Sequence, residues 1–181
     1  DVYMVRPEYS KSKKFYLLSE KQLSEINNLD KLALCRNNLG IVYRELGMFD
    51  KAIAVYLKNI RHFERTQELD GLVMSYNNIG IIYEKIADFQ KALLYYRKAV
   101  NLVSDPQIEA KISLLLNIGV VHDLSNSLDS AEHYYLRVIE LASEVEVSDP
   151  YLLTGAYSNL SAVYVKNGKL NEAKALQLEG I

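Results

Sequence analysis

Apolar residues recur along the chain at spacings of three and four, the pattern of amphipathic helices. One such stretch runs from Leu32 to Leu46, and a second begins at Phe49. Between the members of each pair the chain must turn sharply, and the residue there is Gly47, Ala87, Asn126 or Gly168. Gly and Asn accept the left-handed conformation that ends helices, whereas we expect Ala87 not to do so readily. The pattern predicts helices over residues 11–26, 31–46, 49–65, 71–86, 89–104, 107–124, 128–145, 150–167 and 170–181.

The same columns of residues recur in four segments, which predicts an array of helix pairs. A small residue marks each repeat, at Gly40, Gly80, Gly119 and Ser161, with intervals of 40, 39 and 42 residues. Three residues after each marker stands Tyr43, Tyr83, His122 or Tyr164. Twelve residues after it stands Ala52, Ala92, Ala131 or Ala173, and sixteen after it Tyr56, Tyr96, Tyr135 or Gln177. We therefore expect one array over residues 1–181, with a truncated repeat at 1–30, full repeats at 31–70, 71–110 and 111–149, and a C-terminal repeat at 150–181.

These columns are interpreted as packing positions. The markers and the alanines are small because two helix backbones are expected to approach closely there. The tyrosines fill the wider gaps, with their hydroxyls reaching solvent or a polar partner. Since no repeat can bury its apolar stripe alone, the repeats must stack on one another.

Both ends of the chain fall inside repeats, and the first residue is Asp rather than Met. We expect the chain to have been processed or excised from a longer protein. Repeat arrays need polar caps, so Leu176, Leu178 and Ile181 are candidates for weak self-association through a truncated end.

Composition excludes several classes of protein. Hydrophobic residues make up 49% and charged residues 24%, which is typical of globular domains and argues against disorder. The formal charge of −2 gives no electrostatic footprint for nucleic acid, and most of the 14 tyrosines fall in the packing columns rather than beside basic runs. No stretch is long and apolar enough for direct membrane insertion. The compartment stays open, with the cytoplasm slightly favoured and the periplasm an alternative, because many exported bacterial proteins also lack disulfides.

Candidate chemistry is sparse. The sequence holds no phosphate-binding glycine loop, no nucleophile elbow and no H-E-x-x-H motif. Cys35 lies on an apolar stretch and is interpreted as a packed residue rather than a nucleophile. His62, His122 and His133 have no metal-ligand spacing, and His122 occupies an aromatic packing column. The sequence thus indicates no enzyme, no metal and no cofactor.

The segments LGIVY, FDKAIAVY, IGIIY, FQKALLYY and IGVVH resemble the tetratricopeptide repeat, whose usual unit is about 34 residues. The departures from its pattern are Ser161, His122 and Gln177. The extra residues at the repeat junctions are similar to the longer variety found in bacterial peptide-pheromone receptors and in kinesin light chains. This resemblance implies an all-α fold, a right-handed α-α superhelix, with a concave groove lined by first helices that binds a peptide or a partner helix.

Helix phase then selects candidate groove residues. Asn37 and Asn77, three residues before their markers, should face the groove, where a side-chain amide can pair with a peptide backbone; plain solvation is the alternative. The asparagines two residues before a marker are groove candidates too, although a structural bond between neighbouring helices is the favoured interpretation for them: Asn38, Asn78 and Asn117. An apolar floor is expected at Ile41, Ile81 and Val120, with a charged lip at Arg44, Glu84 and Asp123.

The same inner columns carry Lys or Arg with Asn in members of the family that clamp free acidic C-terminal tails, and this chain departs from that pattern. The sequence is therefore interpreted as a scaffold module that binds a protein or peptide. The alternative is the ligand-sensing part of a larger signalling or transcriptional regulator.

Overall fold

The computed structural model describes residues 7–104, 107–144 and 150–179. These residues form two compact units, which meet in sequence between Ala87 and Asp88. The first unit contains α1 (Pro7–Glu25), α2 (Leu29–Glu45), α3 (Phe49–Thr66) and α4 (Leu69–Lys85). The second contains α5 (Phe89–Val100), α6 (Ile108–Leu124), α7 (Leu128–Ser143), α8 (Pro150–Lys166) and α9 (Leu170–Glu179).

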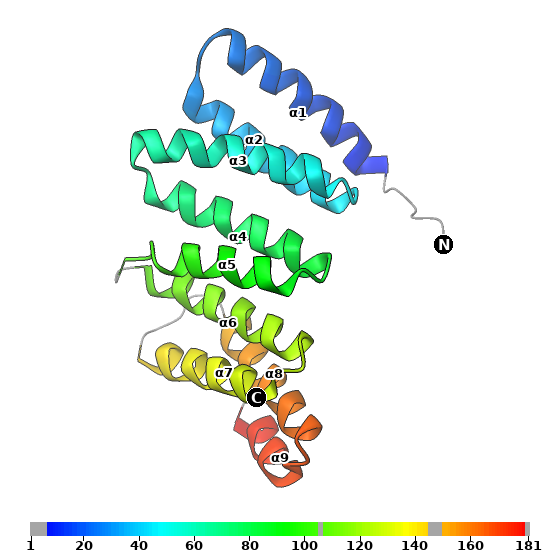
Figure 1. The fold of residues 1–181 in the computed structure, drawn as a ribbon, viewed down its shortest axis with the longest axis vertical. Coiled ribbons are helices and arrows are strands. Elements are labelled where there is room, and N and C mark those ends of the chain that lie inside the picture. Colours follow the sequence, from blue (N-terminus) through cyan, green and yellow to red (C-terminus); the bar gives the residue numbers. More distant parts are fainter. Residues whose placement is uncertain (1–6, 105–106, 145–149, 180–181) are drawn as a thin grey trace. The chain divides into compact units, whose positions relative to one another are not determined.

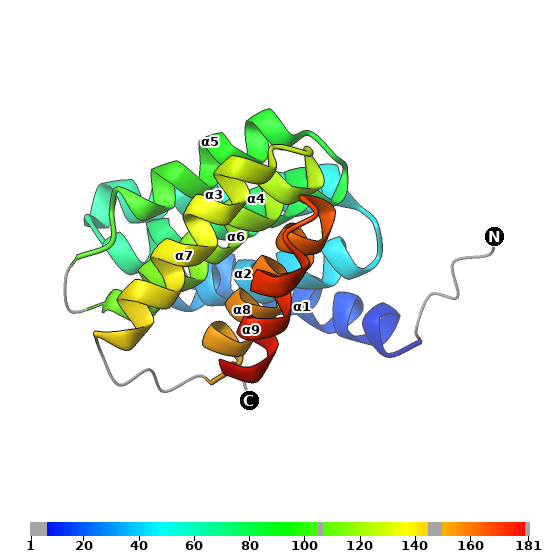
Figure 2. The same cartoon turned by 90° about the horizontal axis from the view of Figure 1, so that it is seen from below.

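Within each unit every helix packs on the next one along the chain (Figure 1). In the first unit α2 also reaches α4, and in the second unit α6 also reaches α8, beside which α9 folds back (Figure 2). The first helices of successive repeats are thus neighbours within a unit, as the repeat pattern predicts. No strand occurs in the described ranges, so the all-α prediction is confirmed.

The predicted helices are all present, and two of their ends lie four residues from the predicted positions. Helix α1 begins at Pro7 rather than at residue 11, because the fixed φ of proline suits the first helical position and its missing N–H needs no partner there. Helix α5 ends at Val100 rather than at residue 104. After Val100 the backbone N–H groups of Leu102 and Val103 bond three residues back, a tighter turn that ends the α-helix.

All four predicted turn residues adopt the left-handed conformation. Gly47 and Gly168 have φ of 68° and 73°, and Asn126 has φ of 59°. Ala87 also has φ of 59°, which confirms the turn there in a conformation that costs alanine more than glycine. The N–H of Ala87 donates to the carbonyl of Glu84 at 2.9 Å, which closes the end of α4 and offsets part of the strain.

The structure corrects the interpretation of the marker column. A Cβ atom on Gly40 would lie 2.5 Å from Cζ of Tyr56, and a Cβ on Gly119 would lie 2.6 Å from Cε1 of Tyr135. The glycines therefore make room for the tyrosine rings sixteen residues later, rather than for a helix backbone. At the fourth marker the Ser161 hydroxyl donates to the carbonyl of Ala173 at 3.2 Å.

The expectation that the tyrosine hydroxyls reach a partner was wrong for Tyr56. Its ring is fully buried, and its hydroxyl has no hydrogen-bond partner in the described part of the chain. Burial raises the pKa of this phenol well above its usual value. Tyr56 is therefore held by ring packing alone.

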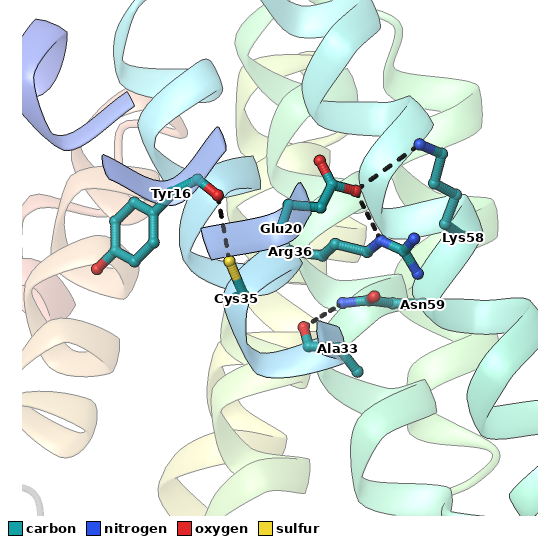
Figure 3. Close-up of polar contacts among 7 residues, drawn as sticks. All are labelled: Tyr16, Glu20, Ala33, Cys35, Arg36, Lys58 and Asn59. Atoms are coloured by element: carbon teal, nitrogen blue, oxygen red, sulfur yellow. Dashed lines mark hydrogen bonds and ion pairs between the residues drawn. The ribbon is translucent and has the colours of Figure 1, made fainter. Parts of the chain in front are cut away.

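Polar contacts bind the first three helices together (Figure 3). Glu20 on α1 accepts a hydrogen bond from Nε of Arg36 on α2 at 2.9 Å and lies 3.8 Å from Nζ of Lys58 on α3. Buried Asn59 donates from Nδ2 to the carbonyl of Ala33 at 2.8 Å. One carboxylate and one amide thus connect three helices.

Cys35 is buried, and its Sγ donates to the Tyr16 carbonyl at 3.4 Å. Burial raises the pKa of this thiol, which disfavours the reactive thiolate. The cysteine therefore packs between α1 and α2, as the sequence indicates.

Among the sequence-predicted end residues, Leu176 packs partly buried against the Leu160 and Val163 core. The side chains of Gln177, Leu178 and Ile181 lie outside the described residues. No described helix is long and apolar enough to cross a membrane.

Candidate functional site

The candidate groove residues lie on the first helices, in columns that run from the middle of each helix to its C-terminal end. All of them are half-buried except Asn38, which is exposed. On α2 and α4 they are Asn37, Asn38, Ile41, Arg44, Asn77, Asn78, Ile81 and Glu84. On α6, in the second unit, they are Asn117, Val120 and Asp123.

One direct bond joins the two rows of the first unit. Nδ2 of Asn78 on α4 donates to Oδ1 of Asn37 on α2 at 3.0 Å. Such a bond between neighbouring helices is the interpretation that the sequence favoured for Asn78, whereas Asn37 was grouped with Asn77 as a groove residue. Successive residues on a helix point about 100° apart, so Asn37 faces the following repeat while Asn78 faces the preceding one.

This bond leaves half of each amide unused. The Nδ2 group of Asn37 still has its donors, and Oδ1 of Asn78 still has its acceptor lone pairs. Neither Nδ2 of Asn37 nor Oδ1 of Asn78 makes a hydrogen bond to the residues that the structure describes. A backbone peptide group offers one acceptor and one donor, so the pair presents the matching atoms.

Apolar side chains flank this amide pair on both sides. Towards the C-terminal ends of the helices lie Ile41 and Ile81, both half-buried. One turn in the other direction lie Leu34 and Met74, which are 60% and 47% exposed. The sequence analysis missed these two residues, although Leu34, Asn37 and Ile41 share one helix face by their spacing.

The second unit does not repeat the amide pair. At the position of Asn37 stands Leu116, whose Cδ2 would lie 3.7 Å from a Cβ on Gly155. Val120 packs against the core of Tyr135 and Leu160 rather than lining an open floor. The face of α6 is thus closed by apolar contact with α8.

The charged lip also differs between the two units. In the second unit both carboxylate oxygens of Asp123 accept from Nζ of Lys166, at 2.6 and 2.8 Å. In the first unit Nε of Arg44 donates to its neighbour Glu45 at 3.0 Å. A cavity of about 550 Å³ lies at this lip, lined by Arg44, Glu45, Leu46, Gly47, Phe49 and Lys85. Sequence analysis missed Lys85, which follows the candidate Glu84.

The histidines and acidic residues that the structure describes do not gather into a metal site. Within the described ranges no three His, Cys, Asp or Glu side chains are placed to hold a metal ion. His122 is half-buried and stacks on Tyr134, with ring centroids 5.3 Å apart and planes 10° apart. Burial and the nearby charge of Arg97 lower the pKa of His122, so the neutral ring is favoured. Its role is packing.

Comparison with solved structures identifies the same type of fold. The BtubC (BKLC) structure from P. vanneervenii is 22% identical, with a TM-score of 0.83, and the match covers 96% of this chain and 72% of that one. The apo form of RapI is 17% identical with a TM-score of 0.82, and the match covers 97% of this chain but 48% of RapI. The MamA RS-1 ArsTM double mutant is 14% identical with a TM-score of 0.61, and the match covers 93% of this chain and 92% of that one. At these identities the likeness concerns the fold alone.

Comparison at the level of sequence gives the family. No curated protein sequence matches the chain. Three family models do match, each described as a tetratricopeptide repeat, at residues 20–105, 112–144 and 153–181. These matches extend over most of the chain and over helices of both units, and the chain therefore belongs to the tetratricopeptide repeat family.

Proposed function

We propose that the chain binds an extended peptide segment of a partner protein on the face shared by α2 and α4. The tetratricopeptide repeat is in general a protein-interaction scaffold, and its fold is typically non-catalytic. To this general role we add the binding face, formed by α2 and α4, and the kind of ligand, an extended peptide.

The Asn37–Asn78 pair is the observation that carries this proposal. Its remaining donor and acceptor match the carbonyl and N–H of a peptide group, and this match does not depend on the side chains of the ligand. A bound peptide would cover the exposed side chains of Leu34 and Met74, and this burial would favour binding, since apolar surface removed from water contributes about 25 cal/mol per Å². Backbone affinity from the amides and side-chain affinity from the apolar rows are the two parts of extended-peptide recognition.

The test is selection from a library of random nine-residue peptides, followed by titration of the selected peptides against variants. Each hydrogen bond to a neutral partner contributes about 0.5–1.5 kcal/mol, so Asn37→Ala or Asn78→Ala should weaken binding about three- to tenfold. The double variant should lose more. Asn171→Ala removes an exposed amide from α9, a helix that is not part of this face, and should leave affinity unchanged.

Melting curves accompany each titration, because loss of the Asn37–Asn78 bond also removes a contact between two helices. Wild-type affinity in a folded double variant would refute the use of this face. The alternative, a ligand-sensing part of a larger regulator, would use the same residues, so the same variants address it.

A further inference from the structure

We propose that the cavity between Arg44 and Lys85 binds a carboxylate group of the peptide ligand. The inference rests on the proposed function, since it concerns the end of the same helix face. It assigns to that face a preference for an acidic group at one position of the ligand.

The repeats themselves indicate which chemistry fits this cavity. Asp123 stands four residues after its marker on α6, and Lys166 stands five residues after its marker on α8. These two side chains form an ion pair between neighbouring first helices, at 2.6 Å. The fold therefore brings the fourth position of one repeat into reach of the fifth position of the next.

In the first unit the same two positions are occupied by Arg44 on α2 and Lys85 on α4. Both side chains are cations, so the carboxylate that completes the pair in the second unit is missing from this one. Between the equivalent positions the structure has the cavity of about 550 Å³ instead. A carboxylate from a ligand would occupy the place that Asp123 has in the second unit.

The cavity wall has the groups that such a ligand needs. The guanidinium of Arg44 uses Nε for Glu45, and its two terminal nitrogens have no partner in the part of the chain that the structure describes. The same holds for Nζ of Lys85. Phe49 and Leu46 are half-buried and supply apolar surface for the methylene groups of an acidic side chain. Among the residues that line the cavity, two cations face the single carboxylate of Glu45, which leaves an excess positive charge on the wall.

The free protein tolerates this excess because both cations lie in the last turn of a helix. Arg44 is the second-last residue of α2 and Lys85 is the last residue of α4, where the partial negative charge of the helix terminus stabilises a cation. Arg44 also continues the row of Asn37 and Ile41 at helical spacing. A peptide held at the amide pair therefore passes the cavity at one end of the row.

The test uses the 181-residue chain and an array of nine-residue peptides, built on a peptide selected by the wild type. Each position carries Glu in one peptide and Gln in its partner, with the C-terminus amidated. A second pair of peptides has a free or an amidated C-terminus without Glu. The wild type should prefer the carboxylate over the amide about three- to tenfold at one position. Preference for Glu identifies a side chain as the source, and preference for the free C-terminus identifies the terminal carboxylate.

Two variants and a matched control complete the test. Lys85→Gln should reduce the preference to less than about twofold. Lys85→Glu, which places a carboxylate of the chain itself opposite Arg44, should abolish it. Lys31→Gln makes the same change of net charge at the other end of α2 and should retain the full preference.

The outcomes separate the inference from the proposed function. Peptides that bind without any preference for a carboxylate, or with a preference that survives Lys85→Glu, overturn the inference alone. If the Asn37→Ala and Asn78→Ala double variant still binds normally, or if no peptide is retained by the wild type, the proposed face fails and the inference fails with it.

Discussion

The contrast between two glycines tests the corrected account of the packing. Gly40 on α2 and Gly155 on α8 both lie inside first helices, where alanine is favoured over glycine by about 1 kcal/mol. They differ in the space around them. A Cβ on Gly155 meets one atom at an ordinary distance of 3.7 Å, whereas a Cβ on Gly40 would meet Cζ, Cε1 and the hydroxyl of Tyr56 at 2.5–2.8 Å.

The expected effects follow from these distances. Gly155→Ala should stabilise the protein by about 1 kcal/mol, because it gains helix propensity without a clash. In Gly40→Ala the Tyr56 ring must move by roughly 1 Å in a close-packed, fully buried site, and overpacking of this kind costs about 1–3 kcal/mol. The propensity gain offsets part of that cost, so the two variants should differ in stability by about 1–3 kcal/mol.

Urea and thermal unfolding followed by circular dichroism measure the difference. For a chain of this size, 1 kcal/mol corresponds to about 2–4 °C in Tm. Tyr56→Leu removes the ring, so Gly40→Ala should cost less in a Tyr56→Leu background than in the wild type, and a double-mutant cycle quantifies this coupling. Equal stabilisation by Gly40→Ala and Gly155→Ala would refute the assignment of Gly40 to the Tyr56 ring.

Three further predictions concern single residues. Ala87→Gly should raise the free energy of unfolding in urea by about 0.5–1 kcal/mol, because glycine relieves the backbone strain at φ of 59°. The greater entropy of glycine in the unfolded chain offsets only part of this gain, and a lower stability of the variant would show that Ala87 is not strained. Tyr56→Phe should change Tm little or raise it, since the buried hydroxyl makes no hydrogen bond; a loss above about 1 kcal/mol would reveal a partner. His122 has a lowered pKa in the folded protein, so the unfolded chain takes up the proton first, and stability should fall as the pH drops below the ordinary value of 6.5. His122→Tyr, which restores the residue of the other repeats, should weaken this dependence of Tm on pH, and an unchanged profile would place the responsible group elsewhere.

Periodicity predicted the helices and turns because these depend on local signals. Glycine and asparagine at Gly47, Asn126 and Gly168 mark the left-handed turns, and the apolar spacing marks the helices between them. Ala87 adopts the same turn without the signal, since the hairpin around it requires it. The left-handed Gln67 at the end of α3 carries no signal either, and it was not predicted.

Contacts between helices were harder to predict than the helices themselves. Recurrence indicates that Gly40 and Tyr56 are packing positions, but it does not show that Gly40 makes room for the Tyr56 ring. The sequence favoured a bond to a neighbouring helix for Asn78, as observed, but did not identify Asn37 as the residue that accepts it. Leu34 and Met74 were missed because their column does not recur: the equivalent residues are Ser113 and Gly155.

The recurring and the varying columns therefore have different roles. The alanine column and the tyrosines sixteen residues after the first three markers keep their residue type and are buried in both units, as with Tyr56 and Tyr135, and they hold the helix pairs together. Other columns change within the candidate site, where Asn37 is replaced by Leu116 and Arg44 by Asp123 in the later repeat. In the second unit the replacements bond or pack within the chain, through Asp123 with Lys166 and Leu116 beside Gly155. In the first unit the same positions retain an unused donor, an unused acceptor and two cations. The polar and charged positions that bond or pack within the chain on α6 and α8 are therefore available to a partner on α2 and α4.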